Sequence, residues 1–204
     1  QMTRARDMAN IAAGSFSIPS GSLTNAVPAA GSITNSMLAS GAITSADLPS
    51  GSVLQAVSTE RTDTDSWDGM ADIFSLNITP ISTSSKILVQ FSCFCSGTNR
   101  YNGFKLYRDS TQIALGDANG NRTPLWIAME ANNDEQSQGY VSRHVSGSYL
   151  DSPSTTSQIT YKINGGNYYG ASGYTFYLNR PPLDGDAIYF GLGSTNLILM
   201  EIAG

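Results

Sequence analysis

Charged residues are scarce in this chain. Its 204 residues include 11 Lys and Arg and 16 Asp and Glu, which together make up 13% of the sequence. That share is about half of the one found in ordinary soluble domains. The formal net charge is −5, and the few basic residues are scattered apart from Arg4 and Arg6. Nucleic acid and anionic membrane surfaces both attract basic patches, so we expect neither as a partner.

Long apolar runs are also missing. No window approaches the ~20 apolar residues of a membrane-spanning helix, so we expect no membrane insertion. The N-terminus lacks the apolar run of a signal peptide, and we expect none. The hydrophobic fraction is nevertheless 40%, which suffices for one packed core.

The chain has only two cysteines, Cys93 and Cys95. Neighbours on one face of a strand lie roughly 6.5–7 Å apart, whereas a disulfide needs Cβ atoms about 3.5–4.5 Å apart. An internal disulfide is therefore not expected. Both cysteines share the phase of Val89 and Phe91, which favours core positions. A metal site is the alternative, but it needs more ligands, and His144 is the only histidine.

The residues for catalysis are equally few. A hydrolase triad needs a nucleophile, a base and an orienting acid, and the chain contains no G-x-S-x-G elbow. His144 shares a less apolar strand face with Ser142 and Ser146, which indicates an exposed or hydrogen-bonded structural histidine. Carboxylate pairs can assemble from distant strands, so a glycan-cleaving enzyme stays an alternative to the favoured non-enzymatic protein.

One short segment has the alternate spacing of a calcium loop. It contains Asp117, Asn119 and Asn121, but Ala128 stands where such a loop needs a bidentate Glu. A hairpin turn is the favoured interpretation. We expect no metal and no cofactor.

What the chain does have is an internal repeat. The decapeptides GSLTNAVPAA, GSITNSMLAS and GAITSADLPS follow one another, with Gly21, Gly31, Gly41 and Gly51 at a period of ten. A fixed period means that each unit adopts one conformation and propagates. Ordering a residue costs roughly 1–2 kcal/mol of backbone entropy, and two apolar side chains per ten residues bury too little to offset that.

The repeat, residues 14–52, is therefore either a flexible linker or a stalk of several chains. Regular apolar spacing favours the stalk. Its core candidates are Leu23, Val27, Ile33, Leu38, Ile43 and Leu48. We expect three parallel chains, the usual solution in fibres, although the repeat does not itself fix that number.

Residues 53–204 show the period of two that is typical of half-buried antiparallel strands. Alternating apolar positions are Phe74, Leu76 and Ile78; Ile87, Val89 and Phe91; Ile159, Tyr161 and Ile163; Tyr174, Phe176 and Leu178; and Ile198, Met200 and Ile202. Further strands are expected within 53–62, 102–116, 125–131 and 138–150. Expected turns are 63–68, 82–85, 117–121, 164–167 and 181–185. Eight or nine strands predict an all-β head, an antiparallel, jelly-roll-like β-sandwich.

Aromatic residues near the loops are the best candidates for a ligand surface. They are Trp126, Tyr168, Tyr169 and Tyr174. Aromatic rings can stack on sugars and carry much of the binding energy at interfaces. Packing within the head or between subunits is the alternative role for these rings.

Several further motifs stand in a recognisable order along the chain. The N-terminal TRARDMANIA and the GAIT-x-x-x-L repeats resemble the opening of many phage structural proteins. GSVLQAVSTERTDT, ITPISTSSKILVQFS, KLYRDSTQIALGDANGNR, SYLDSPSTTSQITYKI and LILMEIAG resemble the head module of tail-fibre or minor structural proteins, notably in phages of aquatic bacteria. The resemblance implies a virion fibre, assembled in the host cytoplasm, whose head binds a host surface glycan or protein. A capsid head fibre or decoration protein has the same anatomy and stays open.

The N-terminal segment, residues 1–13, is expected to attach the fibre to another virion structural protein. The segment is too short to fold alone, so its order should come from that partner. Apolar contacts and charge-assisted hydrogen bonds to carboxylates would come from Met2, Arg4, Arg6, Met8 and Ile11.

We expect the purified chain to be a parallel homotrimer, because the repeat has no core of its own. Light scattering should give three times the mass of one chain.

Replacing Ile33 and Ile43 together by Asp would bury unpaired charges at several kcal/mol each. That change should make residues 14–52 sensitive to protease while residues 53–204 stay folded. A monodisperse monomer at micromolar concentration would contradict the predicted homotrimer.

Overall fold

The computed structural model describes residues 43–98, 101–129, 141–170 and 172–204. The chain divides into two compact units, Gln1–Thr44 and Ser45–Gly204, and the elements described below belong to the second. The predicted anchor residues Met2, Arg4, Arg6, Met8 and Ile11, and the predicted stalk residues Leu23, Val27, Ile33 and Leu38, lie outside the described residues. The two remaining stalk candidates, Ile43 and Leu48, are exposed.

Strands make up the second unit, and the described residues contain no α-helix. After a 3₁₀ turn at Ser45–Asp47 come β1 Val53–Arg61, β2 Asp65–Asp68, β3 Met70–Ile78, β4 Lys86–Gly97, β5 Asn102–Arg108, β6 Thr111–Ile113, β7 Ile127–Met129, β8 Arg143–Asp151, β9 Ile159–Asn167, β10 Thr175–Leu178 and β11 Thr195–Ile202. The predicted all-β class is confirmed. Alternating apolar residues with many Ser and Thr fit a pleated surface that is buried on one side.

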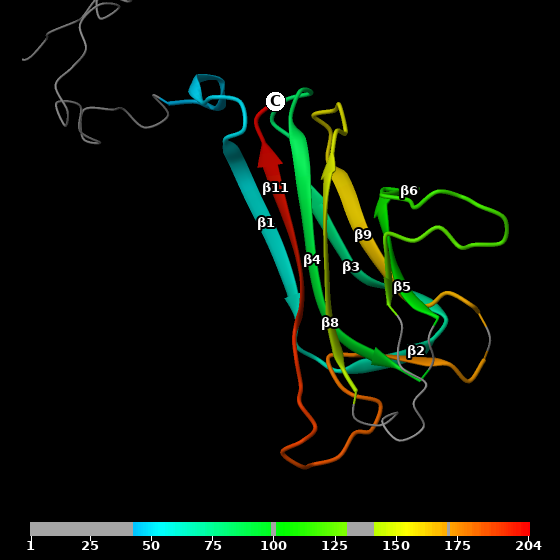
Figure 1. Cartoon of the computed structure of the whole chain (residues 1–204). Coiled ribbons are helices and arrows are strands. Elements are labelled where there is room, and N and C mark those ends of the chain that lie inside the picture. The colour runs from blue at the N-terminus through cyan, green and yellow to red at the C-terminus, as the bar shows by residue number, and fades with distance from the viewer. Residues whose placement is uncertain (1–42, 99–100, 130–140, 171) are drawn as a thin grey trace, which may run out of the picture. The chain divides into compact units, whose positions relative to one another are not determined.

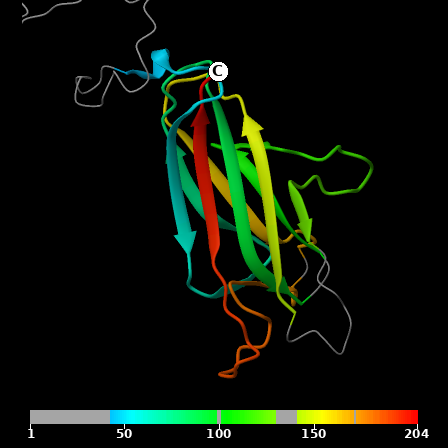
Figure 2. The same ribbon diagram turned by 60° about the vertical axis from the view of Figure 1, so that its left-hand side comes forward.

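The strands form two antiparallel sheets, which Figure 1 and Figure 2 show facing each other. In the first, called sheet A, β11 lies between β1 and β4, and β8 pairs with the other edge of β4. Beyond the start of β11, β10 takes its place beside the last residues of β4, and β10 also pairs with β2. In the second, called sheet B, the order is β3, β9, β5 and then β6 and β7, which both pair with β5.

One hydrophobic core fills the space between the sheets. Phe91 of sheet A packs on Phe104 of sheet B with ring centroids 5.1 Å apart. The predicted core positions of Cys93 and Cys95 are confirmed, since both are fully buried free thiols. The neighbouring Cys93 thiol and burial together raise the pKa of Cys95, which keeps it a poor nucleophile.

A buried network ties the edge of sheet A to sheet B. One guanidinium nitrogen of Arg108 on β5 donates to both carboxylate oxygens of Asp151 on β8, at 3.0 Å each. The Tyr161 hydroxyl on β9 donates to the same carboxylate at 2.6 Å. Burial, followed by the Asp151 carboxylate, raises the pKa of Tyr161. The hydroxyl therefore stays protonated and keeps donating.

Three details differ from the sequence predictions. Residues 65–68 form β2 instead of a turn, because Trp67 packs on Phe176 with ring centroids 4.9 Å apart and β2 pairs with β10. Residues 164–167 are the end of β9, because the glycines there let β9 approach β3 and β5 closely. Residues 102–116 contain a hairpin, with Asp109 at a positive φ of 54° between β5 and β6.

The phase of β11 is also opposite to the predicted one. The apolar alternation indicates core positions for Ile198, Met200 and Ile202. The structure instead buries the residues between them, Leu197, Leu199 and Glu201, each with 0% exposure. Residues 197–200 are apolar in both phases, so the pattern alone is ambiguous. Pairing of Leu197 with the buried Phe91 sets the phase.

A buried carboxylate, Glu201, fastens the end of β11. It accepts hydrogen bonds from the Ile81 backbone N–H at 2.7 Å and from the Gln55 side-chain amide at 2.5 Å. The same Gln55 amide donates to the Thr79 carbonyl at 2.8 Å. Burial alone would raise the pKa of Glu201, but the hydrogen bonds outweigh it and hold the pKa below its ordinary value.

Glu201→Gln should lower the free energy of unfolding at neutral pH by about 1.5–3 kcal/mol, because one acceptor oxygen becomes an N–H that faces the Gln55 amide. A carboxylate whose pKa is depressed by folding contributes to the free energy of unfolding. That contribution is complete above the unfolded-state pKa of about 4.3 and is lost as the pH falls through the folded-state pKa. The difference from wild type should therefore narrow in acid. Urea unfolding across pH measures it, with Glu60→Gln, exposed on β1, as the control. A pH-independent difference would contradict the assignment.

Candidate binding cleft

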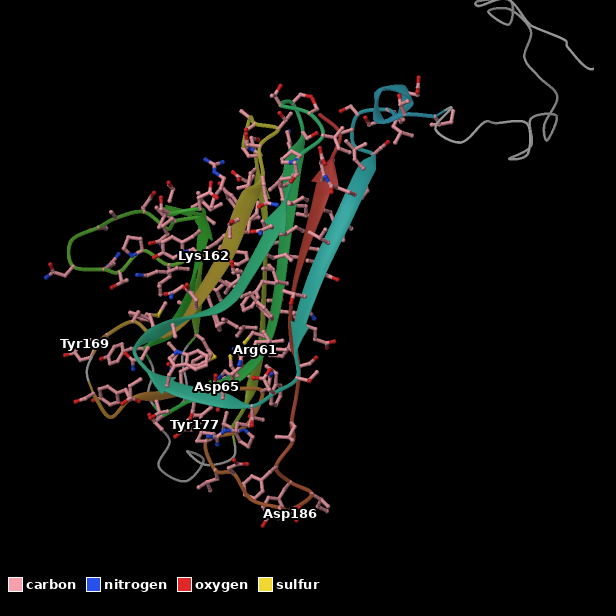
Figure 3. All side chains as sticks on the ribbon, turned by 180° about the vertical axis from the view of Figure 1, so that it is seen from behind. Arg61, Asp65, Lys162, Tyr169, Tyr177 and Asp186 are labelled. Carbon is pink, nitrogen blue, oxygen red and sulfur yellow. The ribbon has the colours of Figure 1, made fainter. Side chains whose placement is uncertain are left out.

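A cleft of about 670 Å³ lies between the β6–β7 segment and the turn that follows β9. Its aromatic lining consists of Tyr101, Trp126, Tyr168 and Tyr169. Its polar lining consists of Asp117, Asn121, Arg122 and Thr123, all exposed. Figure 3 labels Tyr169, which lies at the outer side of this region.

The tyrosines form a connected aromatic cluster. The rings of Tyr101 and Tyr169 stack with centroids 4.9 Å apart and an interplanar angle of 24°. Tyr168 meets Tyr101 edge-on at 6.1 Å, and Tyr174 meets Tyr169 edge-on at 6.5 Å. Tyr169 keeps 63% of its surface exposed and Tyr101 keeps 38%. The cluster thus presents apolar ring surface to solvent while holding each ring in place.

Local backbone geometry fixes the tyrosine turn. The buried Asn167 side-chain oxygen accepts the N–H groups of Tyr169 at 2.9 Å and Gly170 at 3.3 Å. The Tyr168 N–H donates to the Tyr101 carbonyl at 2.9 Å, which joins the turn to the start of β5. Just before it, Gly166 has a φ of 136°, and a Cβ there would lie 2.1 Å from the Gly69 carbonyl oxygen. Only glycine fits at that position.

The opposite wall is held at both ends of the β6–β7 segment. The Gly116 N–H donates to the Leu125 carbonyl at 3.2 Å, and the Trp126 N–H donates to the Phe104 carbonyl at 2.9 Å. The Gln112 side-chain amide adds a hydrogen bond to the Pro124 carbonyl at 3.2 Å. The segment that carries the polar residues of the wall is therefore fixed at both of its ends.

The structure brings the four sequence-predicted ligand residues into one neighbourhood. Trp126, Tyr168 and Tyr169 line the cleft, and Tyr174 contacts it through Tyr169. Trp126 also packs against the core, with its ring centroid 6.1 Å from that of Phe91. It therefore packs within the head, which is the alternative role that the sequence left open, and it also lines the cleft.

Sequence reasoning missed Tyr101. It lies 67 residues before Tyr168, outside the Gly-rich segment that singled out the other tyrosines. Only the pairing of β5 with β9 places Tyr101 beside Tyr168. The sequence predicted a hairpin turn at Asp117 and Asn121. They lie instead in the segment between β6 and β7, which both pair with β5 and not with each other, and nothing in the sequence placed them beside the tyrosines.

The lining supports binding by stacking and hydrogen bonding. Aromatic faces supply apolar contact, and the amide, hydroxyl, carboxylate and guanidinium groups can orient a polar ligand. Among the described lining residues there is one carboxylate, Asp117, and one guanidinium, Arg122. Their formal charges cancel, which suits a neutral polar ligand such as a sugar. Within the described ranges, no group of three or more His, Cys, Asp or Glu is placed to hold a metal ion.

The sole histidine lies elsewhere, on the outer face of sheet A. His144 is exposed, and its Nε2 atom lies 2.7 Å from the Ser92 hydroxyl. The predicted exposed, hydrogen-bonded position is confirmed.

Comparisons with known proteins give no identification. No protein-family profile matches the chain, and no curated protein matches it either. In the part of the chain that the structure describes, no helix has the length and apolar character to span a membrane.

Asn167→Ala should loosen the tyrosine turn, because the N–H groups of Tyr169 and Gly170 lose their acceptor. We expect a loss of about 1–2 kcal/mol in the free energy of unfolding. Amide hydrogen exchange across residues 168–170 should accelerate, while exchange in β4 changes little. Asn119→Ala, in the β6–β7 segment, is the control. Unchanged exchange in the turn would show that Asn167 does not position the tyrosines.

Proposed function

We propose that this protein is a structural, homotrimeric fibre of a bacteriophage virion, a tail fibre whose head binds a neutral glycan on the host surface. The observation that carries the proposal is the aromatic cleft, where Tyr101, Trp126, Tyr168 and Tyr169 meet neutral and charge-balanced polar groups. Residues 14–52 form the stalk, and residues 1–13 attach the fibre to another virion protein.

The head is a jelly-roll-like β-sandwich in this proposal, and the order of strand pairs supports it. The strands pair as nested partners: β1 with β11, β3 with β9, β4 with β8, and β5 with β6. Rolling up one long antiparallel hairpin produces such nesting, which is the basis of the jelly roll. Segments between the nested strands then collect at the ends of the sheets, where loops on a rigid scaffold commonly carry binding sites.

The position of the cleft supports a distal binding site. Figure 1 shows the C-terminus beside the start of β1 at one end of the sheets, whereas β9 reaches the tyrosine turn at the other end. Gly51, the last repeat glycine, is fixed at the first end because its N–H donates to the Ala203 carbonyl at 2.8 Å. The tyrosine turn therefore lies at the opposite end of the sheets from Gly51, where the proposed stalk joins the head. Several weak sites on one fibre would then act together on a cell surface.

Replacing Tyr168 and Tyr169 together by Ala should weaken binding of the full-length protein to susceptible cells. Two aromatic contacts of about 1 kcal/mol or more each predict a loss of at least ~30-fold per site. Binding of fluorescently labelled protein to cells, and its competition with phage adsorption, measure the effect. Tyr107→Ala with Tyr189→Ala removes two tyrosines outside the cleft lining and is the matched control. Thermal melting shows whether each variant is folded.

Three outcomes would redirect the assignment. Equal losses in the two double variants would mean that the cleft is not the binding site. Wild-type protein that does not bind cells, together with normal adsorption of phage that lack it, would favour a capsid head fibre or decoration protein. Release of reducing sugar from host polysaccharide would favour the glycan-cleaving enzyme.

A further inference from the structure

The outer face of sheet A carries an apolar row that crosses four strands. Ala56, Met200, Leu88 and Leu150 occupy directly paired positions on β1, β11, β4 and β8. Two further pairs flank this row on β1 and β11. Val53 pairs with Ile202 toward the start of β1, and Ser58 pairs with Ile198 toward its end. Val53 and Leu150 are 53% and 49% exposed, and Leu88, Ile198, Met200 and Ile202 are partly exposed. These six larger residues are called the apolar face.

The outer face of sheet B has the opposite character. The corresponding row across β3, β9 and β5 is Ser75, Lys162 and Tyr107, with the Lys162 ammonium 5.6 Å from the centroid of the Tyr107 ring. Figure 3 shows this face, with Lys162 on β9. An antiparallel sheet with one face on the core normally turns polar side chains to water on the other. Sheet B follows that rule, whereas the end of sheet A that carries the apolar face breaks it.

Contiguous exposed apolar side chains on a soluble protein mark an interaction surface. Below the apolar face, the same side of sheet A is hollowed over about 590 Å³, with a lining that includes Gln90, Ser92, Ser146, Ser148 and Asn196. These side chains are neutral and can both donate and accept hydrogen bonds. Of the charged residues, Lys86 pairs with Ile202 at the border of the apolar face, and Glu60 lies at the opposite end of β1. Identical surfaces that meet would therefore bring no like charges together at the centre.

The covalent course of the chain favours a second copy of this chain as the occupant. The repeat of residues 14–52 ends at Gly51 and Ser52, which exchange two backbone hydrogen bonds of 2.8 Å with Ala203 at the end of β11. The next residue, Val53, is already part of the apolar face. Copies joined through their repeats therefore have the apolar ends of their sheets A close together.

We propose that the apolar face of sheet A packs against a second copy of this chain, so that the heads, and not the repeats alone, hold the assembly together. This inference rests on the proposed self-association of the repeat. It adds a specific contact surface, with Met200 and Leu88 at its centre. The aromatic cleft lies away from this surface and stays accessible.

Ile198→Lys with Met200→Lys tests the surface in the full-length chain. Bringing several like charges together should raise the dissociation constant of the oligomer at least about tenfold. Sedimentation velocity over a concentration series measures it. Ser75→Lys with Asn77→Lys places the same charges on exposed positions of β3 in sheet B and is the matched control. Circular dichroism reports whether each variant retains its strands.

A second measurement does not depend on charged substitutions. A photoreactive phenylalanine analogue at position 200 should cross-link to sheet A of another copy, whereas the same analogue at position 77 should give no cross-link between chains. A wild-type monomer would overturn this inference together with the proposed fibre assembly. A wild-type oligomer with unchanged assembly of the Lys variant, and no cross-link between chains at position 200, would overturn this inference alone.

Discussion

The structure depends on the burial of one face of each sheet against the other. Because the described residues contain no disulfide and few charged pairs, apolar contact across the core is the main interaction that holds sheets A and B together. Phe91 on Phe104, and Phe104 on Phe176 at 5.9 Å, connect the two layers. The period of two then decides which side chains remain outside. The aromatic cleft and the apolar face both consist of side chains that the core leaves exposed.

Buried polar groups complete the core where strands change partners. Asn179 has a positive φ of 59° and is fully buried between β10 and β11. Its amide nitrogen donates to the carbonyls of Arg61 and Asp63 at 2.9 and 2.8 Å, and its side-chain oxygen accepts the Thr195 hydroxyl at 2.8 Å. One side chain thus joins the end of β1, the approach to β2 and the start of β11. Asn tolerates this backbone conformation better than most residues.

The sequence predicts the fold class and most strands, because alternation is a local signal. It predicts the burial of Ile87, Val89, Cys93 and Cys95 for the same reason. It fails at β2, whose four residues become a strand only through Trp67 on Phe176 and pairing with β10. It fails at the phase of β11, where both phases are apolar. In the cleft, the Gly-rich turn is visible as a local pattern, whereas Tyr101 joins it through a contact between residues distant in sequence.

The misread phase of β11 is itself informative about function. A strand that is apolar in both phases is typical of a sheet that is covered on both sides. The core covers Leu197 and Leu199, so Ile198 and Met200 are the residues whose apolar character the single chain does not explain. The cleft, by contrast, combines exposed tyrosine rings with a polar wall. The same head therefore presents two chemically different surfaces. In the proposals made here, the apolar surface packs against an identical chain and the aromatic surface binds a sugar.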